Sequence, residues 1–226
     1  MPKGILTWSQ VNVDSNSRQS LMNEKQQITI LATITADNTK LPLMFIAEGQ
    51  TEKVEKTQLG DVDYHWTTHS DNGWITEESF IKYLMHVREH FFDDDTIHLL
   101  LDIYKAHCTE KVKEMAQVLN IQLHFIPAGM TDEMQPLDRS IFGPFKAMSR
   151  KLFRERNNLG QPIKITKSEA CSDIIRAWDS VKIDSIREAW SIYNKEEWDA
   201  EQERKRIKNR KTPKAMRRCS NPRRLK

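Results

Sequence analysis

The stretch Leu99-Leu100-Leu101-Asp102, continued by Ile103-Tyr104-Lys105-Ala106-His107, decides how this chain is interpreted. Three consecutive leucines are typical of a buried strand, and that strand would carry Asp102 at its C-terminal end. A second carboxylate follows in Met134-Gln135-Pro136-Leu137-Asp138, where a loop turns into a predicted helix. Carboxylates from two separate elements that converge in space can hold two divalent cations about 3.5–4 Å apart.

The segments around Asp102 alternate between strand and helix patterns. A strand is predicted over 97–101, a helix over 109–120 with apolar residues on one face, and a strand over 122–126. A strand, a crossover helix and a second apolar strand form a parallel βαβ unit, in which ligands bind at the C-terminal strand ends. The pattern therefore predicts an α/β fold with Asp102 at a ligand-binding edge.

Other segments extend the α/β pattern in both directions. A hairpin is predicted from strands over 28–35 and 43–47, with Asp37-Asn38 in the turn. Thr76 is predicted to cap a helix in which apolar residues recur every three or four positions. Further helices are predicted over 142–156, 168–179 and 183–193.

Several short motifs of this sequence resemble those of the DDE-type transposases of the pogo/Tigger/jerky group, within the mariner superfamily. Besides the two carboxylate words, the resemblance rests on segments in the family's order, namely Asn23-Glu24-Lys25, Ala36-Asp37-Asn38-Thr39-Lys40-Leu41-Pro42, Asn72-Gly73-Trp74-Ile75 and Ile126-Pro127-Ala128-Gly129-Met130-Thr131. It covers residues 1–195 and implies a partial DDE endonuclease domain. That domain would be an RNase H-like mixed sheet with flanking helices, incomplete at its N-terminus, followed by a helical segment and a basic tail over 196–226.

The resemblance implies that Asp102 and Asp138 are catalytic residues that bind Mg²⁺ or Mn²⁺ for the cleavage and joining of DNA. Each residue also has a simpler interpretation. Asp102 can be a turn former or a helix cap, and Asp138 can be an N-cap, because Pro136 disfavours helix at the preceding residue. His107 lies in the family's "AH" word and is interpreted as a hydrogen-bonding anchor at a helix start.

The family's first catalytic Asp precedes a Met-Pro pair that resembles Met1-Pro2, so this chain is expected to lack it. Asp14 precedes Glu24 in a polar stretch and is not expected to end an apolar strand. The paired helix-turn-helix modules of such transposases are absent as well. Catalysis is therefore expected to be weak or absent, and the enzyme assignment stays open.

Composition is that of an ordinary globular protein, with 38% hydrophobic and 30% charged residues among 226. No apolar run approaches the ~20 residues of a membrane-spanning helix, so no membrane partner is expected. No small-molecule substrate is implied either. Cys108, Cys171 and Cys219 have no C-x-x-C partner, which favours reduced thiols over a disulfide framework or a zinc site.

The net charge of +3 combines two unlike regions. Residues 204–226 hold 12 of the 35 Lys and Arg and no Asp or Glu, so residues 1–203 carry a net −9. A basic block of this kind is a solvated tail, a nuclear import signal or a phosphate-binding segment. Its candidate DNA contacts, together with those of the helix after Asp138, are Lys146, Arg150, Lys151, Arg204, Lys205, Arg206, Lys208, Arg210 and Lys211.

Two functions follow from these observations. The first is a transposon-derived DDE endonuclease domain that binds DNA in the nucleus, with catalysis impaired by the missing carboxylate. The second is a domesticated nuclear module that binds DNA or a protein without catalysis. Trp66, Trp74, Trp178 and Trp190 are interpreted as packing residues in either case.

Overall fold

The computed structural model describes residues 5–14, 27–91, 95–157 and 166–193. The chain divides into two compact units, residues 1–189 and 190–226. The elements described below lie in the first unit, apart from the last residue of helix α7. No helix in the described part of the chain is long and apolar enough to span a membrane.

A six-stranded mixed sheet forms the centre of the first unit. Its strand order is β4-β3-β2-β1-β5-β6. The antiparallel pairs are β1–β2 and β2–β3, whereas β3–β4, β1–β5 and β5–β6 are parallel. The strands are β1 (Ile5–Asp14), β2 (Gln27–Thr35), β3 (Met44–Glu48), β4 (Trp66–Ser70), β5 (Ile97–Asp102) and β6 (Ile121–Ile126).

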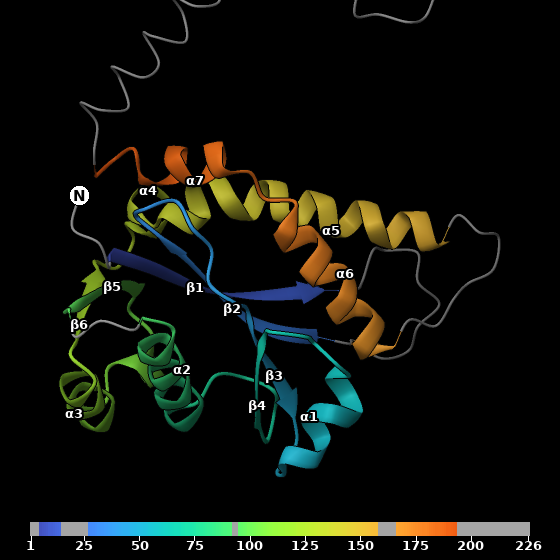
Figure 1. The fold of residues 1–226 in the computed structure, drawn as a ribbon, viewed down its shortest axis with the longest axis horizontal. Coiled ribbons are helices and arrows are strands. Elements are labelled where there is room, and N and C mark those ends of the chain that lie inside the picture. Colours follow the sequence, from blue (N-terminus) through green and yellow to red (C-terminus); the bar gives the residue numbers. More distant parts are fainter. Residues whose placement is uncertain (1–4, 15–26, 92–94, 158–165, 194–226) are drawn as a thin grey trace, which may run out of the picture. The chain divides into compact units, whose positions relative to one another are not determined.

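Helices cover both faces of this sheet, and Figure 1 shows α1, α2 and α3 on one side with α5 and α6 on the other. The helices are α1 (Glu52–Leu59), α2 (Glu77–His90), α3 (Glu110–Val118), α4 (Thr131–Met134), α5 (Phe142–Asn157), α6 (Lys167–Asp179) and α7 (Ile183–Trp190). A 3₁₀ turn, η1 (Lys105–His107), follows β5, and a π-helical turn, η2 (Leu137–Ile141), precedes α5. This arrangement confirms the predicted mixed sheet with flanking helices.

Helix α2 follows directly from its sequence. Thr76 and Ser79 form a reciprocal capping box. Two glutamates lie in the first turn, where their negative charge interacts favourably with the positive end of the helix dipole. Its apolar face, centred on Phe80, Tyr83 and Leu84, is fully buried against the sheet. Tyr83 crosses to β2, where its hydroxyl shares a 2.6 Å hydrogen bond with Thr33 Oγ1. The predicted helix is therefore confirmed, with its buried hydroxyl paired.

The opposite face of the sheet is covered by α5 and α6, whose rings of Phe145 and Trp178 meet edge to face. Trp178 Nε1 donates to the carbonyl of Leu41, in the connection between β2 and β3. Lys40 beside it donates to the carbonyls of Trp178, Asp179 and Val181, at 2.7, 3.2 and 3.4 Å. These carbonyls lie at or beyond the C-terminal end of α6, where the negative end of the helix dipole attracts a cation. The predicted hairpin thus also anchors a distant helix.

Two sequence interpretations need correction. Trp74 is 40% exposed and is not a core residue, because it lies in the loop that joins β4 to α2. Asp14 is the last residue of β1, paired with Gln27, and so does end a strand. The polar residues of this segment were compatible with a strand because its partner β2 provides nine residues of continuous antiparallel pairing.

Candidate active site

Asp102 reaches the surface because β5 alternates strictly between buried and partly exposed residues. Ile97, Leu99 and Leu101 belong to the core that contains α2 and α3. Successive side chains of a strand point to opposite faces, so Asp102 lies on the face turned away from that core. It is the last residue of β5, which runs parallel to both β1 and β6. The side chain is 34% exposed, whereas its Oδ1 atom is buried and accepts no hydrogen bond in the described structure.

Asp138 comes from the π-helical turn η2. Leu137 and Ile141 of this turn are fully buried, and their anchoring leaves Asp138 half-buried between them. The turn packs against β1, the strand next to β5. A π turn carries one residue more than a regular turn and is frequent at functional sites, because it reorients the side chains that follow. Asp138 is therefore not the N-cap that the simpler interpretation allowed.

The two carboxylates are close enough for the charge of Asp102 to act on Asp138. Burial raises the pKa of Asp102. Burial also raises the pKa of Asp138, the charges of Asp102 and Asp132 raise it further, and the ammonium of Lys146 opposes them. Desolvation and like charge both disfavour two carboxylates at one place. A bound cation would relieve both effects, which makes this edge a candidate cation site.

His107 supports the Asp102 side of the site from within the core. The imidazole is fully buried, with the ring of Phe80 at 4.3 Å and that of Tyr104 at 5.2 Å between centroids. Its Nδ1 lies 3.8 Å from Asp102 Oδ1. Burial lowers the pKa of His107 to about 4, although a hydrogen bond with the backbone of Asp102 opposes this. The neutral ring therefore contacts the end of β5 from the side of the core.

The register of β1 decides which of its residues lies level with Asp102. The parallel pairing of β1 with β5 ends at Thr7 opposite Leu100. Carried two residues further, this register brings Ser9 level with Asp102. Asp14 lies five residues beyond Ser9, roughly 16 Å along an extended strand. Asp14 therefore ends a strand but is too far along it to share a cation with Asp102.

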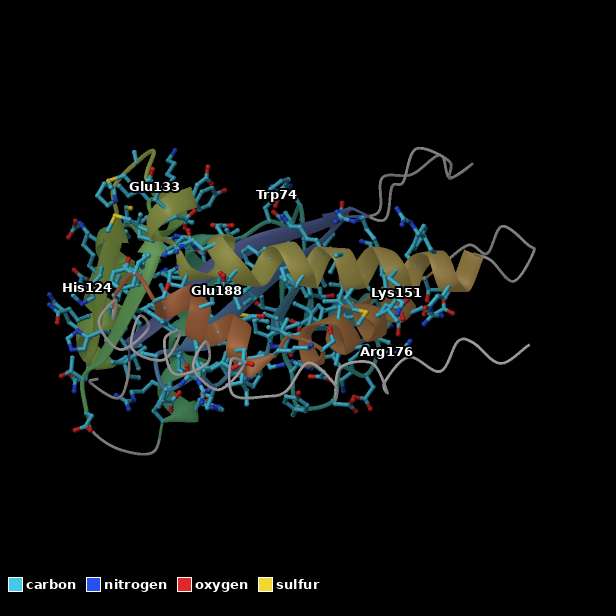
Figure 2. All side chains as sticks on the ribbon, turned by 90° about the horizontal axis from the view of Figure 1, so that it is seen from above. Trp74, His124, Glu133, Lys151, Arg176 and Glu188 are labelled. Atoms are coloured by element: carbon cyan, nitrogen blue, oxygen red, sulfur yellow. The ribbon has the colours of Figure 1, made fainter. Side chains whose placement is uncertain are left out.

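A basic surface begins next to Asp138 and follows α5. Lys146, Arg150 and Lys151 are exposed, and so is Arg154; Figure 2 labels Lys151 in the C-terminal half of the helix. Positions 146, 150 and 154 are spaced by four residues and share one side of a helix, over about 12 Å. The candidate DNA contacts in the tail, residues 204–211, lie outside the described residues.

Lys151 already lies 3.7 Å from Glu155, and Arg156, at the end of the helix, is bound more firmly. Its guanidinium makes a bidentate contact with Asp173 of α6, at 2.7 and 3.0 Å. Sequence reasoning also missed that Lys146 lies beside Asp138. The spacing of eight residues was the available signal, because residues eight apart share one side of a helix.

No group of three or more metal-binding side chains occurs among the residues whose structure is described. Asp102 and Asp138 form a pair, which is one carboxylate fewer than the family arrangement implies. Carboxylate oxygens are the ligands that Mg²⁺ and Mn²⁺ prefer. The unpaired Oδ1 of Asp102 fits such a cation, although two carboxylates hold it less firmly than three.

Sequence comparison places this architecture in a family. The pattern that defines the DDE superfamily endonucleases matches residues 25–190, so the chain belongs to that family. The match includes Asp102, Asp138 and all of α5.

Individual relatives are more distant. The chain is 25% identical over 195 residues to the human "Pogo transposable element with KRAB domain", covering 79% of this chain and 31% of that protein. It is 29% identical over 131 residues to the mouse "Jerky protein", covering 53% of this chain and 22% of the relative. The chain thus spans about a third or less of these relatives. A solved Mos1 transposase catalytic domain with Mn is 10% identical, with a TM-score of 0.42 over 77% of this chain and 78% of that one.

Proposed function

We propose that this chain is a transposon-derived DDE endonuclease domain that binds DNA and a divalent cation but cleaves DNA poorly. The observation that carries the proposal is the placement of Asp102 at the end of β5 and of Asp138 in a turn that packs against the neighbouring strand β1, where the charge of Asp102 raises the pKa of Asp138. These are the positions where the family resemblance expects two of its three carboxylates. The same turn leads into the exposed cations of α5.

Asp102 and Asp138 would hold Mg²⁺ or Mn²⁺, which supplies Lewis acidity toward a phosphodiester oxygen and lowers the pKa of bound water. Ionised carboxylates are needed for this role. Burial works against ionisation of both side chains, and the charge of Asp102 adds to this effect at Asp138. Lys146 offsets part of that repulsion at Asp138. His107 contributes by holding the backbone that carries Asp102, since it is buried, neutral and 3.8 Å away from the carboxylate.

DNA would follow α5 away from the carboxylates. Lys146, Arg150 and Arg154 would contact phosphates along one groove edge, because a row of cations about 12 Å long matches several successive phosphates. Such contacts position the duplex and do not read its sequence. The acidic body opposes this attraction, so the basic tail is proposed to supply most of the remaining affinity and to direct the chain to the nucleus.

The impairment follows from the β1 register. Ser9 is level with Asp102, and a serine hydroxyl is a far weaker ligand for Mg²⁺ than a carboxylate. A two-metal reaction needs one carboxylate that bridges both cations. With two carboxylates in place, one cation would be held and the second lost. A module that binds DNA or a protein without catalysis is the alternative that this deficit favours.

Cation binding tests the proposal directly. Mn²⁺ titration of the chain, followed by electron paramagnetic resonance, is expected to show one weak site that Asp102→Asn and Asp138→Asn each weaken at least tenfold. Asp184→Asn, a change at an exposed carboxylate of α7, is the matched control and should leave binding unchanged. Binding that survives both site variants would remove the cation site from the proposal.

Cleavage and the missing ligand form a second test. We expect no detectable Mn²⁺-dependent nicking of supercoiled DNA by the chain. Ser9→Asp should tighten Mn²⁺ binding, because it adds a carboxylate level with Asp102. Robust nicking by the unaltered chain that Asp102→Ala abolishes would show that another residue supplies the third ligand.

A further inference from the structure

Two histidines lie side by side on the sheet, away from the carboxylate pair. His98 of β5 and His124 of β6 occupy neighbouring parallel strands, with His98 opposite Gln122 and His124 opposite Leu100. Residues 98, 100, 122 and 124 share one face of the sheet, because side chains two residues apart point the same way. His98 is partly exposed and His124 is exposed, and Figure 2 shows His124 at the outer edge of the sheet.

The two imidazoles meet through their nitrogen atoms. His98 Nδ1 and His124 Nε2 are 3.0 Å apart, and the ring centroids are separated by 5.2 Å. In the neutral pair a single proton occupies the space between two nitrogen lone pairs. Continuous pairing from residue 97 to residue 102 holds the backbone of both histidines in register. The sheet therefore keeps two nitrogen donors within reach of a single metal ion, which would replace the proton that they share.

This separation selects among metals. Imidazole nitrogens bind divalent transition metals at about 2.0–2.1 Å. Two such bonds to nitrogens 3.0 Å apart enclose an angle of about 94° at the metal, worked from that bond length. An angle near 90° fits neighbouring positions of a square-planar or octahedral centre, the geometries of Cu²⁺ and Ni²⁺. The tetrahedral angle that Zn²⁺ prefers, about 109°, needs nitrogens further apart.

We propose that His98 and His124 form a two-histidine binding site for a square-planar or octahedral transition-metal ion such as Cu²⁺ or Ni²⁺. Water completes the coordination, because no third metal-binding side chain joins the pair among the described residues. The centre of the pair lies about three residues before Asp102 along β5, roughly 10 Å away. This distance exceeds the spacing of a two-metal centre, so the site is separate from the carboxylates and does not rest on the proposed function.

The electrostatic environment agrees with this assignment. Burial lowers the pKa of His124, and the neighbouring His98 lowers it further. The neutral form of the ring is the one that binds metals. Imidazoles also discriminate against Mg²⁺, which prefers oxygen ligands, so the two sites of the chain take different ions.

Calorimetric titration of the whole chain with Ni²⁺ and with Zn²⁺ tests the site. We expect Ni²⁺ to bind more tightly than Zn²⁺, and His98→Gln and His124→Gln each to lower the Ni²⁺ affinity at least tenfold. His86→Gln is the matched control. It removes a partly exposed imidazole that stacks on Trp66 and leaves the pair intact, so Ni²⁺ affinity should stay unchanged.

Pulsed electron paramagnetic resonance of the Cu²⁺-loaded chain counts the imidazoles directly. Two are expected in the unaltered chain and in His86→Gln, and one in each variant of the pair. Wild-type Ni²⁺ affinity in either variant, a single imidazole in the unaltered chain, or tighter binding of Zn²⁺ than of Ni²⁺ would each overturn the proposal. Circular dichroism checks that the variants are folded, and the exposed His124 decides the matter if His98→Gln does not fold.

Discussion

Acidification is expected to destabilise this protein through His107, well above the pH at which carboxylates titrate. The folded chain lowers the pKa of this imidazole to about 4, whereas an unfolded chain leaves it near 6.5. Below pH 6.5 the unfolded state therefore binds more protons than the folded state. Stability is full above pH 6.5 and falls as the pH drops toward 4. Linkage gives a loss of about 2 kcal/mol between pH 8 and pH 5 from these two values.

Another buried histidine and the two carboxylates of the candidate site also change the stability of the protein with pH. His65 acts in the same direction, because burial lowers its pKa and its Nδ1 must stay unprotonated to accept the N–H of Leu43 at 2.8 Å. Asp102 and Asp138 act in the opposite direction, because their pKa values are raised in the fold. Their protonation stabilises the fold only as the pH falls toward and below those raised values. His107→Gln leaves both carboxylates in place and therefore isolates the histidine contribution.

Denaturant unfolding at pH 8, 6.5 and 5 measures this effect in the metal-free chain. His107→Gln removes the titrating ring, so the loss of stability over this range should shrink by about 2 kcal/mol, whatever the absolute stability of the variant. For a domain of this size that difference corresponds to roughly 4–8 °C in the midpoint of thermal unfolding. His86→Gln should keep the pH dependence of the unaltered chain. An unchanged pH dependence in His107→Gln would refute the reasoning.

Three further outcomes are expected. Lys40→Met should lower stability by about 2 kcal/mol, because the ammonium hydrogen-bonds three carbonyls near the end of α6 while its burial limits the gain. Lys113→Met, at an exposed lysine, is the matched control and should leave stability nearly unchanged in the same unfolding assay. Asp173→Asn should cost about 2–3 kcal/mol, because it breaks the bidentate contact between α5 and α6, and equal melting temperatures would contradict this. Truncation after residue 203 should remove most of the DNA affinity at low salt, since residues 204–226 hold 12 cations and no acidic residue. It should also reduce the slope of log affinity against log salt concentration. A truncated chain with unchanged affinity and slope would point to α5 as the main DNA surface.

The parts of the fold that local patterns encode were predicted well. The hairpin expected at 28–35 and 43–47 is β2 and β3, and the predicted βαβ unit is β5, α3 and β6 in parallel pairing. The segments that were missed have weak patterns of their own. β4 is a five-residue edge strand, α1 is short and polar, and β1 acquires its structure from nine residues of pairing with β2. Such segments depend on partners that lie far away in the sequence.

By itself the sequence determined the α/β class, the position of Asp102 at a strand end, the family resemblance and the charge contrast between body and tail. These conclusions rest on local hydrophobic periodicity, on short sequence motifs and on the number of charged residues in each region. None of them depends on a contact between residues far apart in the sequence. Only the tertiary structure decided which charges meet. A π turn brought Asp138 near Asp102 and Lys146, and the register of β1 set Ser9, not Asp14, level with Asp102. Helix packing paired Arg156 with Asp173, and two neighbouring strands aligned His98 with His124. The physical reason is that strand register and helix packing fix distances between residues that the linear order leaves independent.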